Sequence, residues 1–335
     1  MTSITFLERV SRYSIYLLVL LIPLWMLPFS QNILDYQKQA LLVVSVFVAL
    51  SASLALVVNK GEIAFRKSIV SLFVLPVVVG AGLSTLFSLW KYGSFWGWPL
   101  HTTDNFITII SFAFLYFVIL NHIKSLKDLV SVYFFFIASA AGAALFGLLQ
   151  LYGIFLLPFS FAKQIGFNTI GTPSNLAVFI AFILPLTIVL AFLSRSLLKW
   201  VLWVLVMALF GILAVVNFSE AWFVLIAGLL VLLAFGMWNV KKRSEFGWAS
   251  LPMAFLVVAI FFIAFKVSLP GSPTTPVEVR PSMQAEISIL SEVLQKRPVL
   301  GSGPGTFVFE YTKFHPAALN QTVFWGTRFG SGASE

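Results

Sequence analysis

Long apolar runs separated by short polar stretches make up roughly the first 265 residues of the chain. Each run is about 20 residues long, which is the length that an α-helix needs to cross the hydrocarbon core of a bilayer. A membrane barrel would instead need alternating segments of about 10 residues. The runs predict nine transmembrane helices, at residues 14–30, 39–58, 68–90, 106–121, 129–158, 172–193, 197–216, 221–240 and 249–266. We therefore expect an all-α fold, a polytopic transmembrane helical bundle of about nine spans with a helical extracytoplasmic loop.

Composition indicates that a lipid bilayer surrounds this chain, and it argues against nucleic acid as a partner. Hydrophobic residues make up 60% of the 335 and charged residues 10%, and the mean hydropathy is +0.99. The net charge of +9 comes from short basic tufts between the apolar runs, which favours topology determinants and contacts with anionic lipid. The chain has no cysteine, which excludes disulfides, a thiolate nucleophile and a thiolate metal site.

The distribution of basic residues predicts the orientation. Arg9 and Arg12 precede the first run, which Pro23 and Pro28 interrupt, so we interpret it as an uncleaved first helix. With a cytoplasmic N-terminus, the short outside loops hold three basic residues, Lys38, Lys91 and Lys163. The inside loops hold twelve: Arg9, Arg12, Lys60, Arg66, Lys67, Lys124, Lys127, Arg195, Lys199, Lys241, Lys242 and Arg243. This bias predicts that residues 267–335 are extracytoplasmic.

The stretch from Arg280 to Glu335 differs in kind from everything before it. Pro281 suits a first helical position, and Lys296 and Arg297 suit a helix end that Pro298 closes. Apolar residues recur at helical spacing, first Met283, Ile287, Leu290 and Leu294, and after a glycine-rich turn Phe307, Tyr311 and Phe314. We therefore divide the chain into a transmembrane domain, residues 1–266, and an extracytoplasmic loop, residues 267–335, which acts as a lid. The loop ends without a closing helix, so we expect it to be truncated and further spans to follow in the full protein.

Four patches together resemble one protein family. They are FWGWPLHTTDNFITIISF, GTPSNLAVFIAFILPL, NFSEAWFVLIAGLLVLL and RPSMQAEISILSEVLQKRPVLGSGPGTFVFEYTKF. Their order and topology are similar to those of the superfamily of O-antigen ligases and O-antigen polymerases, which are glycosyltransferases of the bacterial inner (cytoplasmic) membrane that act in lipopolysaccharide and polysaccharide biosynthesis. The last patch is the most specific, because it resembles the arginine-led helix and G-x-G-x-x-F turn that begin the large external loop of the family. The resemblance covers residues 80 to 335.

The resemblance implies an activity and a set of residues. Family members transfer a glycan from a polyprenyl (undecaprenyl) pyrophosphate carrier to an acceptor in the cell envelope, without metal or cofactor. They have about a dozen spans, external arginines that hold the pyrophosphate and, in the ligases, a loop histidine as the base. Arg280 matches the leading arginine and Asn175 the asparagine that opens the sixth helix. Gly301, Gly303 and Gly305 match the turn.

Two departures from the family pattern leave alternatives open. Ser219 is followed by Glu220 where the family commonly has an arginine, and the histidine–asparagine pair expected late in the loop finds Ala333, Ser334 and Glu335. The chain is then a divergent member, a member whose histidine lies beyond residue 335, or an inactive truncated homologue. A transporter or flippase for a lipid-linked glycan is the alternative from another class, although the sequence shows no internal repeat and Glu220 lies at a span boundary rather than inside a span.

The chemistry ranks the candidate residues. Departure of a pyrophosphate needs positive charge, so we expect Arg280 and Arg328 to be catalytic, with Arg297 and Lys313 binding substrate. His315 is a candidate general base, because histidine commonly has this role, but its position beside Pro316 on a loop favours a merely exposed side chain.

The remaining candidates each have a structural interpretation as well as a functional one. Glu220 is a base or an interfacial carboxylate, and the glycines from Gly301 to Gly305 form a phosphate nest or a tight turn. No pattern of acidic residues or histidines predicts a metal site. The acceptor, a glycan, a lipid or a protein, is not specified by these residues.

Overall fold

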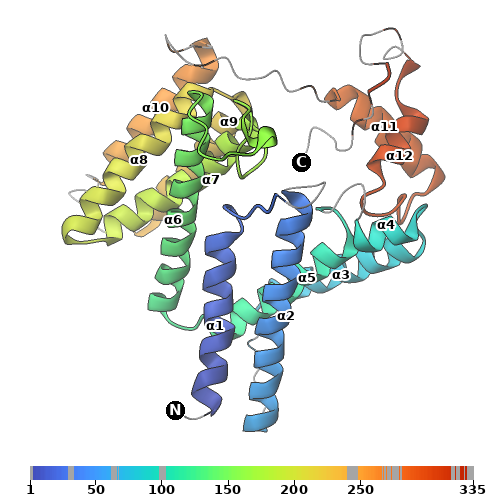
Figure 1. Cartoon of the computed structure of the whole chain (residues 1–335), viewed down its shortest axis with the longest axis horizontal. Helices are drawn as coiled ribbons and strands as arrows, with labels where there is room; N and C mark the ends of the chain where they lie inside the picture. Colours follow the sequence, from blue (N-terminus) through green and yellow to red (C-terminus); the bar gives the residue numbers. More distant parts are fainter. Residues whose placement is uncertain are drawn as a thin grey trace. The chain divides into compact units, whose positions relative to one another are not determined.

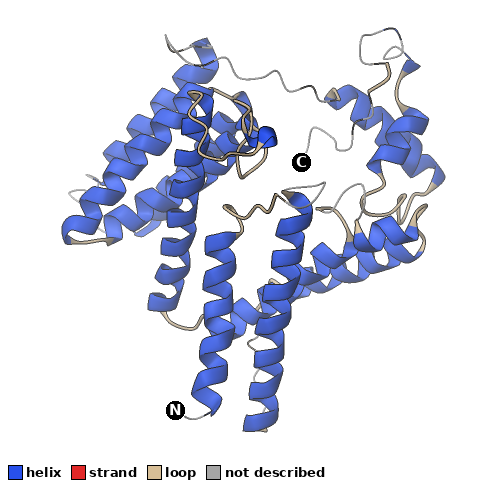
Figure 2. Cartoon of the chain, in the orientation of Figure 1, coloured by secondary structure: helices blue, strands red, loops and turns tan. Residues whose placement is uncertain are grey.

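The computed structural model describes residues 3–28, 34–61, 66, 68–97, 103–239, 248–265, 267, 269, 273, 279, 281–317, 321, 325–327 and 329. Within these ranges every regular element is a helix and no strand occurs, so the prediction of an all-α fold is confirmed (Figures 1 and 2). By its contacts the chain divides into two units. The first unit comprises Met1–Leu18, Phe29–Lys124 and Val277–Glu335, and the second comprises Val19–Pro28 and Ser125–Pro276. The described residues from 279 onward belong to the first unit.

Several helices are long and apolar enough to cross a membrane. Among the described residues there are five, which are Asp35–Lys60, Leu126–Leu151, Pro173–Leu193, Ser196–Val216 and Ser219–Met237. Three shorter apolar helices, Ser71–Leu86, Phe106–His122 and Ser250–Phe265, coincide with further predicted spans. A multi-pass helical membrane protein agrees with these elements, and the count of nine spans stays a prediction.

Two helix boundaries differ from the predicted ones. The first helix, α1, covers Ser3–Leu21, whereas the predicted span runs from 14 to 30. Helix α6, Leu126–Leu151, stops well before the end of the predicted run at 158. Gly153 follows with φ +74, a left-handed conformation that ends an α-helix, and the apolar residues after it form a loop with the short 3₁₀ helix η1, Ser160–Ala162.

The second unit is built around α7, Pro173–Leu193. Thr172 caps this helix by accepting a hydrogen bond from the Asn175 backbone N–H at 3.2 Å. Helices α6, α8 (Ser196–Val216) and α9 (Ser219–Asn239) pack against α7, and α10 (Ser250–Phe265) packs against α9. Four α7 side chains form the centre of the core and have no exposed surface: Ile180, Ile183, Leu184 and Ile188.

The first unit combines membrane-type helices with the late segment of the chain. Helix α5, Phe106–His122, packs against both α2, Asp35–Lys60, and α3, Ser71–Leu86. The short helix α4, Lys91–Trp96, packs against the beginning of α5 and the end of α3. The remaining two helices are α11, Met283–Lys296, and α12, Phe307–Phe314, which contact each other.

The buried face of α11 is not the one that its most hydrophobic residues mark. The predicted apolar row of Met283, Ile287, Leu290 and Leu294 is exposed by 43–72%. Ala285, Ile289 and Val293 are buried instead, and Ile289 and Val293 lie in a cluster with Tyr311 that also includes Phe307 and Phe314. The predicted aromatic face of the second late helix is therefore confirmed as a packing face, and its partner is the opposite side of α11.

Candidate functional site

The turn between α11 and α12 docks onto the polypeptide around α3 and α4. Three of its carbonyl groups accept hydrogen bonds there: Leu300 from Ser84 Oγ at 2.7 Å, Ser302 from the Leu89 backbone N–H at 3.0 Å and Pro304 from Ser94 Oγ at 2.7 Å. Ser88 and Ser94 are buried, and their hydroxyl groups lie 2.6 Å apart. We call Ser84, Ser88 and Ser94 the serine clasp. It joins residues about 210 positions apart in the sequence.

The close approach of the Ser88 and Ser94 side chains explains why position 303 is a glycine. Gly303 has φ +111, and a Cβ atom there would collide with the Ser88 side chain and with Ser94 Oγ. Gly301 and Gly305 also have positive φ, with open space around Gly301. Thr306 closes the turn by donating from Oγ1 to the Gly303 carbonyl at 2.6 Å. The structure therefore supports the reading as a tight turn, and phosphate binding by the same backbone stays a prediction.

Cations gather at the end of α11 and in the last turn of α12. Arg297 donates from Nη1 to the Phe87 carbonyl at 3.2 Å, which adds a fourth tie between this segment and the end of α3. Lys296 Nζ lies 4.2 Å and Lys313 Nζ 5.1 Å from the centroid of the Phe314 ring. Two candidate substrate-binding residues, Arg297 and Lys313, are thus held on one small helical pair.

His315 is half-buried rather than exposed, and α12 fixes its orientation. Its ring stacks on Tyr311 with centroids 5.3 Å apart and an interplanar angle of 19°. Nδ1 lies 3.0 Å from the Tyr311 carbonyl, which can only accept, so Nδ1 carries the proton in the neutral ring. The acceptor nitrogen is then Nε2, which is the arrangement that a general base requires. Burial raises the pKa of the Tyr311 hydroxyl, so this neighbour stays neutral at physiological pH.

The two candidates in the second unit, Asn175 and Glu220, lie in the first turns of α7 and α9, which pack against each other. Asn175 lies beside Gly171. Glu220 is exposed, and a carboxylate at this position interacts favourably with the helix dipole.

Asn217 organises the turn before Glu220, and sequence reasoning missed it. Its backbone is left-handed with φ +49, its Oδ1 accepts from Trp222 Nε1 at 2.9 Å and its Nδ2 donates to the Val267 carbonyl at 2.6 Å. The signal in the sequence was an asparagine directly after an apolar helix, which is a residue that tolerates this conformation at a helix end.

The candidates therefore form two groups. Arg297, the three glycines, Lys313 and His315 belong to the first unit, and Asn175 and Glu220 belong to the second. Arg280 and Arg328 lie outside the described residues.

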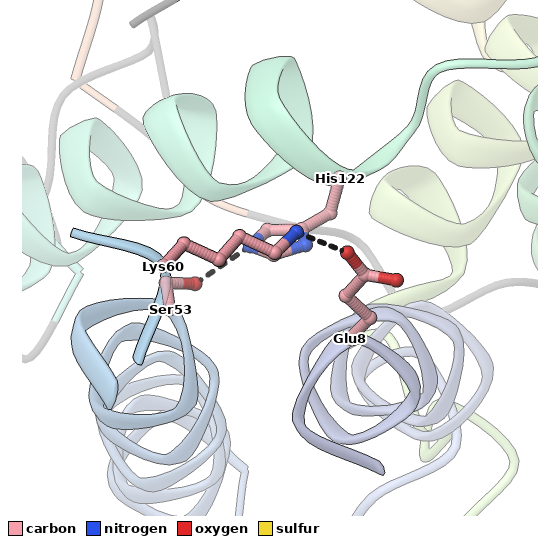
Figure 3. Close-up of polar contacts among 4 residues, drawn as sticks. All are labelled: Glu8, Ser53, Lys60 and His122. Atoms are coloured by element: carbon pink, nitrogen blue, oxygen red, sulfur yellow. Dashed lines mark hydrogen bonds and ion pairs between the residues drawn. The ribbon is translucent and has the colours of Figure 1, made fainter. Parts of the chain in front are cut away.

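A polar cluster at the other end of the first unit was also missed by sequence reasoning (Figure 3). Lys60, the last residue of α2, forms a 2.6 Å ion pair with Glu8 of α1. Ser53 of α2 donates to the Ala49 carbonyl at 2.7 Å, so its oxygen can accept from Nε2 of His122, 2.8 Å away at the end of α5. The basic residues here counted only as topology signals in the sequence, because their convergence depends on how the helices pack.

The serine clasp and the polar cluster around the Glu8–Lys60 pair lie at opposite ends of the first unit. Gln39, in the first turns of α2, donates to Asn105 Oδ1 at 3.0 Å and to Thr108 Oγ1 at 3.1 Å, at the beginning of α5. Gly82, near the end of α3, also lies against Phe106. The serine clasp follows this end of α3, whereas the Glu8–Lys60 pair lies at the opposite end of α2 and α5. A membrane between these ends is the arrangement that the predicted topology requires.

Comparison of the chain with family models, with curated proteins and with solved structures finds no match.

Proposed function

We propose that this chain is a glycosyltransferase of the O-antigen ligase type in a bacterial cytoplasmic membrane. It would transfer a glycan from a polyprenyl pyrophosphate carrier to a glycan, lipid or protein acceptor on the outer face. The proposal rests on the four sequence patches, and one structural observation supports it. The last patch docks at the serine clasp, whose Ser94 directly precedes the first patch, and the other two patches lie on the packed helices α7 and α9.

The chemistry assigns the charged residues their roles. An acceptor hydroxyl attacks the anomeric carbon, a new C–O bond forms, and the bond from that carbon to the pyrophosphate oxygen breaks. Negative charge grows on the departing pyrophosphate, so Arg280 and Arg328 would bind it, with Arg297 and Lys313 nearby in the sequence. The acceptor proton would pass to Nε2 of His315 or to the Glu220 carboxylate.

The test is transfer in vitro from a defined polyprenyl-pyrophosphate-linked oligosaccharide. We expect wild-type protein to release the pyrophosphate carrier and Arg280→Ala to lose at least about 100-fold of that rate, as for loss of one oxyanion donor. Arg195→Ala is the matched control, because Arg195 directly precedes α8 and lies at the end of that helix opposite Asn217. It should keep the wild-type rate.

The readouts separate the alternatives. Equal rates for wild type and Arg280→Ala would remove Arg280 from the mechanism. Movement of the intact glycolipid across liposome membranes without bond cleavage would replace the transferase by a flippase. Absence of both activities, together with no gain from Glu220→Arg, would identify an inactive homologue.

A further inference from the structure

A cavity of about 340 Å³ lies where α1, α2 and α5 meet, at the end of the first unit that carries the Glu8–Lys60 pair. Its ionisable lining residues are Glu8, Arg12, Lys60, His122 and Lys124. Its apolar lining residues include Leu50, Leu54, Val57, Phe117 and Val118. All of them belong to one unit, so the cavity is a feature of a single packed group of helices. None of its residues belongs to the site proposed for glycan transfer.

The charge balance of the cavity favours an anion. The cavity is lined by one carboxylate, one histidine and three basic side chains, Arg12, Lys60 and Lys124. That carboxylate, Glu8, is already engaged by Lys60 at 2.6 Å. The hydrogen bond from Lys60 lowers the pKa of Glu8, and the charges of Lys60, Lys124 and His122 act in the same direction against the opposing effect of burial. Glu8 therefore stays ionised, and the cavity retains a surplus of positive charge.

The apolar lining residues of the cavity point to an amphiphile rather than to a small soluble anion. Leu54, on the cavity wall, exposes 58% of its surface, and the next turn of α2 exposes Val58 by 82%. Both belong to a helix that is apolar enough to cross a membrane, so this exposed surface would contact acyl chains. A volume of about 340 Å³ is at the lower end of ligand pockets, large enough for a headgroup but too small for a whole lipid.

We propose that this cavity binds the phosphate headgroup of an anionic membrane lipid, whose acyl chains lie along the exposed apolar face of α2. The phosphate oxygens would accept charge-assisted hydrogen bonds from Arg12 and Lys124, and from the Nδ1–H of His122 when that ring is charged, because Nε2 already faces Ser53. Such a site would be occupied independently of glycan transfer.

Native mass spectrometry of the full chain, purified in a neutral detergent, tests the proposal with two probes. These are dioleoyl phosphatidylglycerol and dioleoyl phosphatidylcholine, which differ in headgroup charge but not in acyl chains. We expect one tightly bound phosphatidylglycerol. Loss of two charge-assisted contacts in the double variant Arg12→Gln, Lys124→Gln should weaken it by at least about tenfold.

Two further variants keep the result interpretable. Arg9→Gln, Lys127→Gln removes the same two charges from exposed positions that do not line the cavity, and should change the affinity by no more than about twofold. Val57→Trp fills the cavity without changing any charge and should also abolish the tight phosphatidylglycerol. If the Arg12, Lys124 variant does not fold, Val57→Trp alone decides.

Three outcomes would overturn the proposal. Equal binding of the two lipids would show that the headgroup is not recognised. Equal losses of phosphatidylglycerol affinity in the Arg12→Gln, Lys124→Gln variant and in the Arg9→Gln, Lys127→Gln variant would show that only net charge matters. Complete displacement of phosphatidylglycerol by millimolar inorganic phosphate would identify a site for soluble phosphate instead of a lipid.

Discussion

Helix α7 of the second unit and helix α2 of the first unit are held by different means. In α7, 61% of an apolar stretch of 18 residues is buried, and Ala177, Ala181 and Ala191 allow its neighbours to approach closely. In α2 the corresponding stretch is only 28% buried, as it is in α6 and α9 of the second unit. The contacts of α2 include hydrogen bonds instead, from Ser11 to the Ala49 carbonyl at 3.2 Å and from Gln39 to Asn105 and Thr108.

The difference follows from the solvent of membrane helices. Lipid solvates an apolar side chain as well as protein does, so association of helices needs either tight packing of small residues or polar contacts. Around α7 the second unit uses tight packing, and around α2 the first unit adds polar contacts. The second unit should therefore be sensitive to added volume, whereas the first should also be sensitive to changes in its polar contacts.

The largest effect should come from the serine clasp, where a polar contact also demands close packing. Gly303→Ala adds a Cβ that collides with Ser88 and Ser94, in a backbone conformation that strains any L-residue. We expect it to destabilise the docked tail by about 3 kcal/mol. Hydrogen exchange of residues 283–314 measures the docking.

Gly301→Ala is the matched control for this effect. Its φ is also positive, at +61 within the ordinary left-handed helical region, and no atom lies near the added Cβ, so the substitution should cost only about 1 kcal/mol. Equal exchange rates in the two variants would show that the clasp does not require close approach.

Two glycine substitutions test packing in the second unit. Their expected effects on stability are opposite in sign and smaller than the effect at the serine clasp. In Gly228→Ala the added Cβ would meet Pro185 Cγ at 2.7 Å, and a proline ring inside a helix cannot move aside. We expect a loss of about 2 kcal/mol in the free energy of unfolding. Gly211→Ala, in α8, meets nothing within 4 Å and should stabilise by up to about 1 kcal/mol. Unfolding with increasing sodium dodecyl sulfate measures both, and a loss of stability in both variants would contradict the packing argument.

The smallest effect belongs to the Glu8–Lys60 pair. Its side chains are 37% and 42% exposed, so Glu8→Gln should cost about 0.5 kcal/mol or less at neutral pH. The pKa of Glu8 is lowered in the folded protein, so the stabilising contribution is present above the ordinary value of 4.5 and disappears as the pH falls through the lowered pKa. The stability of wild type and variant should therefore converge in acid. A difference that grows on acidification would show that the carboxylate is not held in its charged form by Lys60.

Much of the fold was visible in the pattern of apolar runs. The long helices α2, α7, α8 and α9 lie close to their predicted ranges, because a run of about 20 apolar residues in a membrane leaves the backbone no other way to satisfy its hydrogen bonds. The ends of α1 and α6 were predicted less well. Apolar residues continue past the end of α6 into a loop, and polar residues occupy the beginning of α1, so hydropathy does not mark either boundary.

The site was only partly visible. The sequence indicated a helix, a glycine turn and an aromatic face between residues 281 and 314, and the structure has all three. The sequence did not indicate that Ala285, Ile289 and Val293 form the buried side of α11. The more hydrophobic row was the natural choice, but which row is buried depends on where α12 docks.

The sequence by itself thus determined the class of the protein. The apolar runs require helices, and the number of runs requires several of them. Only the tertiary structure decided that Ser84, Ser88 and Ser94 hold a turn from the other end of the chain, and that Glu8, Arg12, Lys60 and Lys124 line one cavity. The physical reason is that helix formation depends on neighbours in sequence, whereas a hydrogen bond over 210 residues or a shared cavity depends on the packing of whole helices.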